Sequence, residues 1–154
     1  MAAQAGERPR VRVAALMTLG GKVVTVRHRA GSAIYHLLPG GGVDWGETLE
    51  AALLREVSEE TGLSAELGQL LFVNDTIDPS GRRHVVNITF AATVTGGQIT
   101  ASPADKRVEA VDLVSSEDLS TLDLRPPMAR ALQSALAGEA TTPEYLGSLF
   151  TAGA

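Results

Sequence analysis

Three glutamates near the end of one segment have the type and spacing to do chemistry together. Glu56, Glu59 and Glu60 are three and four residues apart, so in an α-helix they project over an arc of about 100°. Leu49 and Leu53, one and two turns earlier, point within the same arc. The stripe that should face the core therefore changes from hydrocarbon to carboxylate, which a solvent-exposed acidic face does not explain.

This arrangement is unfavourable unless something neutralises it. Like charges three and four residues apart each destabilise a helix, and anions near a helix C-terminus oppose the helix dipole. A divalent cation reverses the sign of these effects, and magnesium is commonly held by one or two carboxylates together with substrate phosphates. We therefore predict that Glu56, Glu59 and Glu60 are ligands of a divalent metal ion.

A longer pattern surrounds the three glutamates. It combines a glycine, a glutamate after five residues, an arginine–glutamate pair after seven more, an aliphatic residue, two further glutamates and a final glycine–aliphatic pair. The pattern resembles the Nudix box at every specified position. The matching positions are Gly41, Glu47, Arg55, Glu56, Val57, Glu59, Glu60, Gly62 and Leu63.

The resemblance implies a fold, an activity and a cofactor. Nudix proteins are α/β/α sandwiches with a mixed β-sheet, and we expect that fold class here. The family cleaves nucleoside diphosphates linked to another moiety, by water attack on phosphorus, and it requires Mg²⁺ or Mn²⁺. It also implies that the backbone carbonyl near Gly41 ligates metal, and that Glu47 pairs with Arg55 to orient the helix.

The sequence leaves the general base open. The base must lie within hydrogen-bond reach of the attacking water, and its identity varies among Nudix proteins. Glu59 or Glu56 could serve, with Glu59 both a ligand and a base. Glu109, in the segment VEAVDLV, is the other candidate, as an auxiliary ligand or base, because many family members carry a glutamate there.

Four more residues are predicted to contact the substrate. Arg27 and Arg29 could grip a phosphate with their forked donors, although arginines at strand ends are more often ordinary surface groups. His36 precedes the glycine run, where it could touch the base or ribose or could be structural. Gly40 lets the backbone approach a ligand closely.

Composition excludes several other classes of protein. The chain has 154 residues, a net charge of −5, no cysteine and 4% aromatic residues. It lacks the basic patch and the stacking residues that nucleic-acid polymers require, and it cannot form disulfides or thiolate metal sites. Without an apolar signal core or a long apolar run, we expect a cytoplasmic protein without membrane contact.

Hydrophobic patterns and turn residues predict the order of the elements. Residues 30–42 are expected to be a loop, because the run of glycines breaks regular structure. Strand 84–94 alternates apolar with polar residues, so we expect one buried face. The expected elements are a hairpin of 11–18 and 23–29, a helix from Glu47 or Thr48 to Gly62, a hairpin of 68–75 and 84–94, a strand at 108–114, a short helix from Ser115 to Leu119, and a helix over 128–138 with Pro126 and Pro127 in its first turn.

These elements predict three regions. They are a flexible arm over residues 1–10, a Nudix domain over 11–138, and a tail over 139–154 that packs on the domain or on a partner subunit. Homodimers are common among Nudix proteins, so the resemblance makes a homodimer one possible assembly. The expected small-molecule partner is a nucleotide.

Two functions fit this sequence. The first is a pyrophosphohydrolase acting on ADP-ribose-like or sugar nucleotides, or on noncanonical nucleoside triphosphates. The second is a nucleotide-sensing domain of the same fold that binds without turnover. The complete box favours the enzyme, because sensing domains of this fold have an eroded box.

Overall fold

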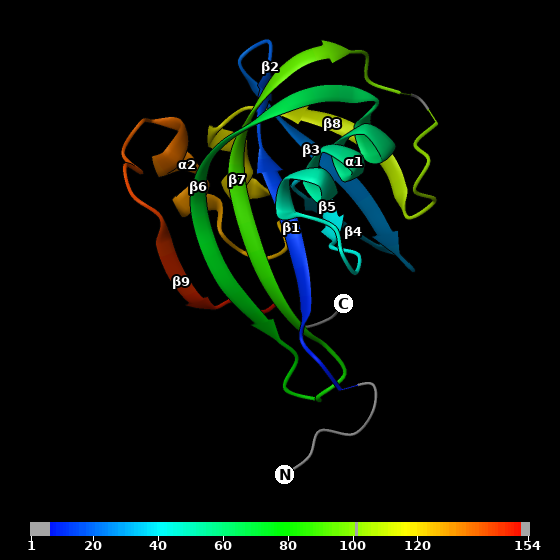
Figure 1. Ribbon diagram of the computed structural model, residues 1–154, viewed down its shortest axis with the longest axis vertical. Coiled ribbons are helices and arrows are strands. Elements are labelled where there is room, and N and C mark those ends of the chain that lie inside the picture. Colours follow the sequence, from blue (N-terminus) through cyan, green and yellow to red (C-terminus); the bar gives the residue numbers. More distant parts are fainter. Residues whose placement is uncertain (1–6, 101, 152–154) are drawn as a thin grey trace.

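Two β-sheets with helices on both sides form the part of the chain that the structure describes, residues 7–100 and 102–151. Figure 1 shows this computed structural model, with α1 and α2 on opposite sides of the central strands. The predicted α/β/α fold class is confirmed. The elements in order are β1 (Arg10–Leu16), β2 (Thr18–Leu19), β3 (Lys22–Ala30), β4 (Ala33–Leu37), β5 (Gly40–Gly42), α1 (Leu49–Thr61), β6 (Leu63–Ile77), β7 (His84–Gly97), β8 (Val108–Val114), the 3₁₀ helix η1 (Glu117–Thr121), α2 (Ala129–Leu136) and β9 (Glu144–Ser148).

The larger sheet is mixed, as predicted. Its strand order is β5-β1-β7-β6-β9. β1 is parallel to β7 and β6 is parallel to β9, whereas β1 with β5 and β6 with β7 are antiparallel pairs. In the smaller sheet, β3 pairs with β2, β4 and β8, always antiparallel.

The expected hairpin of residues 11–18 and 23–29 is wrong in its first strand. Of the segment expected to be its first strand, only the end pairs with β3, through the two-residue strand Thr18–Leu19. β1 belongs to the larger sheet, where β5 and β7 take both of its edges. From Val13 to Leu16 every residue of β1 is buried, which is typical of a central strand covered on both faces. The chain therefore changes sheet at Met17, between β1 and β2.

The glycine run is not the loop that its composition predicted. Gly40–Gly42 is an edge strand that pairs antiparallel with Arg12–Ala14, and residues 33–37 form β4 beside β3. A β-carbon on Gly40 would overlap the backbone of Val13. Glycine is required because the two backbones approach too closely for a side chain.

The helix that carries the glutamates has the predicted limits. Thr48 caps α1, since its Oγ1 accepts a hydrogen bond from the backbone nitrogen of Ala51 at 3.0 Å. Gly62 follows the helix with φ of 77°, in the left-handed conformation that glycine adopts without strain. Both helix-end predictions are confirmed.

Both faces of the larger sheet are buried. Val13 and Ala15 of β1 pack against α1, whereas Ala14 and Leu16 pack in a second cluster with Leu132 of α2. Successive residues of a strand point to opposite faces, so two apolar clusters form on either side of β1.

The expectation of a single buried face on residues 84–94 is wrong. The polar residues Asn87 and Thr89 are 4% and 1% exposed. Their neighbours Ile88 and Phe90 pack against the cluster on the α1 side. The polar face is buried because α2 and the segment before it cover this side of the sheet.

The C-terminal elements follow the prediction with one correction. The short helix is η1, where Ser115 Oγ accepts from the backbone nitrogen of Asp118 at 3.2 Å. Pro126 and Pro127 lie before α2, whose first helical residue is Ala129, and not in its first turn. The two prolines therefore precede the helix.

Strands near both ends of the described part belong to the larger sheet. Of the residues assigned to the N-terminal arm, 1–6 lie outside the described part, and Arg10 already begins β1. At the other end, β9 runs parallel to β6 as an edge strand of the larger sheet. Within the described ranges, no helix is long and apolar enough to cross a membrane.

Candidate metal and nucleotide site

Three carboxylates from two distant segments meet at one place. Glu56 and Glu60 come from α1, and Asp105 comes from the segment that leads into β8. One carboxylate oxygen of each lies within 4.8 Å of the others. Glu56 and Glu60 are only 7% and 2% exposed. We call these three residues the carboxylate triad.

Glu60 is held against the edge of the larger sheet. The backbone nitrogen of Gly40 donates a hydrogen bond to Glu60 Oε1 at 2.7 Å. Burial raises the pKa of Glu60 to about 7, although the Gly40 hydrogen bond and the charge of Arg12 oppose this rise. At neutral pH Glu60 therefore lies near the midpoint of its titration, and a bound cation would favour its charged form.

Arg55 connects the start of α1 to the triad. Its Nε and Nη2 donate to the two carboxylate oxygens of Glu47 at 2.8 and 2.9 Å. Its Nη1 donates to Glu56 Oε1 at 2.8 Å. These hydrogen bonds lower the pKa of Glu47 to about 2 and raise the pKa of Arg55. Glu47 and Arg55 thus lie together, and Arg55 orients Glu56.

Glu59 lies apart from the triad. Its side chain is 45% exposed, and its Oε2 is 3.4 Å from Nη1 of Arg55. The structure therefore brings two of the three predicted glutamate ligands together and leaves the third at the surface beside them.

Gly41 lies directly against Glu56. A β-carbon at Gly41 would overlap the Glu56 carboxylate, so the backbone of β5 and this buried side chain are in close contact. The absence of a side chain at Gly41 is what lets Glu56 occupy its place in the triad.

Asp105 was not predicted from the sequence, and neither was its partner Arg107. Nε of Arg107 donates to Asp105 Oδ1 at 3.1 Å and Nη2 donates to Oδ2 at 2.8 Å. The Arg107 hydrogen bonds lower the pKa of Asp105 and keep it charged. The spacing of an aspartate two residues before an arginine is a local signal for this ion pair. No local pattern, however, indicates that Asp105 lies beside α1.

The predicted substrate residues form a separate network on the smaller sheet. Glu109 accepts from Arg29 Nε at 2.8 Å and lies 3.2 Å from Arg27 Nε. His36 Nε2 is 2.9 Å from Asp112 Oδ2. The Arg29 hydrogen bond, with the charges of Arg29 and Arg27, lowers the pKa of Glu109. Each carboxylate oxygen of Glu109 therefore lies beside an arginine. The charged groups of this network pair with one another and not with the triad.

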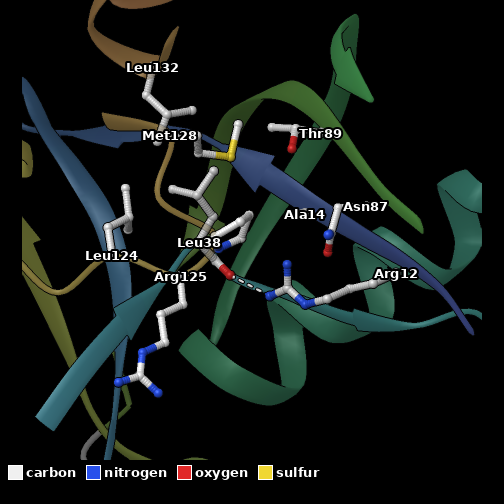
Figure 2. Close-up of a pocket in the computed structure, with 10 residues that line it drawn as sticks. Arg12, Ala14, Leu38, Asn87, Thr89, Leu124, Arg125, Met128 and Leu132 are labelled. Carbon is white, nitrogen blue, oxygen red and sulfur yellow. Dashed lines mark hydrogen bonds between the residues drawn. The ribbon is translucent and has the colours of Figure 1, made fainter. Parts of the chain in front are cut away.

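A small cavity lies on the face of β1 that α2 covers (Figure 2). Arg12 enters it from β1, and its Nη2 donates to the carbonyl of Leu38 at 2.9 Å. Burial lowers the pKa of Arg12, whereas the charges of Glu60 and Glu56 raise it. Arg12 therefore connects the cavity electrostatically with the triad. The lining residues are Arg12, Ala14, Leu38, Asn87, Thr89, Leu124, Arg125, Pro126, Met128 and Leu132.

The triad suits a divalent cation with oxygen ligands. Its three carboxylate oxygens are close enough to share one ion, and two of the side chains are almost fully buried. Buried carboxylates at this separation repel each other without a counter-charge. Magnesium and manganese both accept such carboxylate ligands.

Comparison with known proteins agrees with this geometry. Residues 7–135 match the NUDIX domain. The chain belongs to the Nudix family. The match covers both sheets as far as β8 together with α1, and it ends within α2. The box identified in the sequence therefore lies within a Nudix domain that spans most of the chain.

Individual relatives show the same relationship. The ADP-ribose pyrophosphatase of Methanocaldococcus jannaschii is 45% identical over 76 residues, which are 49% of this chain and 45% of that protein. The chain thus spans less than half of that relative. A MutT NUDIX hydrolase from Burkholderia pseudomallei is 35% identical, with a TM-score of 0.64 over 88% of this chain and 100% of that one. A NUDIX hydrolase from Nitrosomonas europaea is 25% identical, with a TM-score of 0.74 over 86% and 92% of the two chains.

Proposed function

We propose that this Nudix protein is a divalent-metal-dependent pyrophosphohydrolase of a small nucleoside diphosphate derivative. The observation that carries the proposal is the triad, in which two buried glutamates are joined by Asp105 from a distant segment. Burying carboxylates together destabilises a fold unless they are compensated. Arg55 and Arg107 compensate part of this charge, and a bound cation would supply the rest and also the chemistry.

The residues have distinct proposed roles. Mg²⁺ or Mn²⁺, when bound, neutralises phosphate oxygens and lowers the pKa of the attacking water. Glu56, Glu60 and Asp105 would hold it, with the backbone carbonyl of Gly41 as a further oxygen ligand. Arg55 keeps Glu56 directed into the triad. Most of the rate enhancement would come from this fixed electrostatic environment.

Glu59 is our first candidate for the general base. Its half-exposed position beside the triad leaves it accessible to water. Glu56 accepts a hydrogen bond from Arg55 and is nearly buried, and Glu109 is paired with Arg27 and Arg29. Glu59 also lies 3.4 Å from Nη1 of Arg55, so the greater exposure of its carboxylate is what favours it over the other two.

The leading substrates are ADP-ribose-like and sugar nucleotides, with noncanonical nucleoside triphosphates second. The name of the Methanocaldococcus jannaschii relative supports the first class. Leu38, which bonds Arg12, is two residues from Gly40, which bonds Glu60. The backbone from Leu38 to Gly40 therefore joins the wall of the cavity in Figure 2 to the triad.

Product analysis with matched variants tests this function. The protein would be incubated with Mg²⁺ and either ADP-ribose or oxidised deoxyguanosine triphosphate, and the products separated by chromatography. We expect Glu60→Gln to lower turnover by at least about a hundredfold while the circular dichroism spectrum stays unchanged. A sensing domain would instead bind the nucleotide without forming product, and Glu60→Gln would keep its affinity. The proposed enzyme function would be wrong if the wild type bound nucleotide without cleaving it, or if Glu60→Gln kept the turnover of the wild type.

A further inference from the structure

Arg107 is bonded to Asp105, the triad residue that does not come from α1. Asp105 Oδ1 accepts from Nε of Arg107 at 3.1 Å and from its backbone nitrogen at 2.9 Å. Asp105 Oδ2 accepts from Nη2 of Arg107 at 2.8 Å. A carboxylate has about four lone-pair sites, so Arg107 takes most of the acceptor capacity that a cation would need.

The two arginines around the triad differ in how firmly they are held. Arg55 is 30% exposed and is clamped by Glu47 as well as by Glu56. The Arg107 side chain is 72% exposed, and Asp105 is the acceptor of its side-chain bonds. Breaking the Arg107 pair therefore leaves an exposed cation that water solvates well, whereas releasing Arg55 would disrupt a larger network.

The charge of Arg107 acts directly on the place where a metal ion would lie. Its guanidinium is close enough to Glu60 and Glu56 for both to raise its pKa. A positive charge beside the triad opposes the entry of a divalent cation. Once Asp105 turns to a cation, the same forked group is free beside the site, with a geometry that matches phosphate oxygens.

We propose that Arg107 is an exchangeable counterion of the triad, which pairs with Asp105 in the metal-free protein and with a substrate phosphate in the loaded protein. The proposal rests on the proposed function, because it takes the triad as the metal site. It gives Arg107 two effects of opposite sign. Arg107 weakens binding of the metal alone and strengthens binding of the diphosphate.

Binding of Mn²⁺ alone tests the first effect. Mn²⁺ is titrated into the full chain and the free ion is followed by electron paramagnetic resonance. Arg107→Gln should bind Mn²⁺ about threefold to tenfold more tightly than the wild type. Lys106→Gln is the matched control, since it removes one positive charge from the neighbouring exposed residue without touching Asp105, and it should change the affinity by less than about twofold.

Binding of a diphosphate tests the second effect. Methylenediphosphonate, a diphosphate analogue that water cannot cleave, is titrated by calorimetry at saturating Mn²⁺. Arg107→Gln should bind it about tenfold more weakly, and Arg107→Lys should recover part of that loss because it keeps the charge. Lys106→Gln should behave like the wild type.

The outcomes distinguish failure of the proposed role of Arg107 from failure of the proposed metal site. Weaker binding of both Mn²⁺ and methylenediphosphonate in Arg107→Gln would mean that Arg107 only supports the Asp105 loop, and the proposal would be wrong. Unchanged affinities for both would overturn it equally. Failure of the wild type to bind Mn²⁺, with no difference in Glu60→Gln, would instead overturn the proposed metal site itself.

Discussion

Two aspartate–arginine pairs in this protein have the same local geometry and opposite surroundings. In both, an aspartate precedes its arginine by two residues and accepts from Nε and Nη2. The distances are 3.1 and 2.8 Å for Asp105 and Arg107. They are 3.1 and 2.7 Å for Asp123 and Arg125. Local sequence alone would assign both pairs the same role.

Their burial is reversed. In the first pair Asp105 is 13% exposed and Arg107 is 72% exposed. In the second pair Asp123 is 37% exposed and Arg125 is 14% exposed. Arg125 also lies over the ring of Tyr35, 4.2 Å from its centroid, and lines the cavity of Figure 2.

This difference shows which half of each pair can move. A buried charge needs its partner, because an unpaired charge out of water is strongly unfavourable. Arg125 is therefore a fixed part of the cavity wall with Asp123 as its anchor. Asp105 is the buried half of its own pair, and the triad and a cation can replace its exposed arginine.

The largest expected contrast is in the pH dependence of stability. Beside Asp105 lies Glu60, whose pKa rises from 4.5 to about 7 on folding. Between these values the folded protein holds a proton that the unfolded chain has released. Raising the pH through this window should therefore lower the free energy of unfolding of the metal-free protein by about 3 kcal/mol.

Urea denaturation with a chelator present, at pH 5 and at pH 8, measures this effect. Glu60→Gln should lose most of the difference between the two pH values, because glutamine does not titrate. Asp123→Asn, in the second pair, should keep it. If Glu60→Gln showed the same pH dependence as the wild type, another group would be responsible and the burial argument for Glu60 would fail.

The second contrast is in metal binding. Asp105→Asn should weaken Mn²⁺ binding by about a hundredfold, because a neutral amide replaces one of three carboxylate ligands. Asp123→Asn should change it by less than about threefold, since Asp123 is outside the triad. Calorimetric titration of both variants checks this, and equal losses in the two would remove the distinction between the pairs.

The smallest contrast is in thermodynamic stability. Arg125→Gln should lower the free energy of unfolding by about 1–2 kcal/mol, because a mostly buried arginine loses its charge-assisted hydrogen bonds and its contact with Tyr35. Arg107→Gln should lower it by less than about 0.5 kcal/mol, since exposed ion pairs contribute little. Chemical denaturation at pH 7 measures both, and a reversed order would contradict the roles assigned here.

Contacts between distant segments could not be predicted in the same way as the helix. Asp105 reaches Glu56 and Glu60 through the pairing of β8 with β3 and through the hydrogen bond from the Ala104 nitrogen to the Glu59 carbonyl, at 2.9 Å. Gly40–Gly42 looked like a loop because glycine disfavours strands on average, yet it forms β5 where its backbone lies against Val13. In both cases the deciding neighbour is far away in the sequence.

The sequence by itself determined the limits of α1, the position of Glu56 and Glu60 on one face of it, and the family to which the chain belongs. Helix ends and helical faces depend on hydrogen bonds between residues four apart, so local sequence contains the needed information. Only the tertiary structure decided that Asp105 completes the triad while Glu59 stays outside it. Strand pairing and burial depend on competition among all segments of the chain, which no local pattern records.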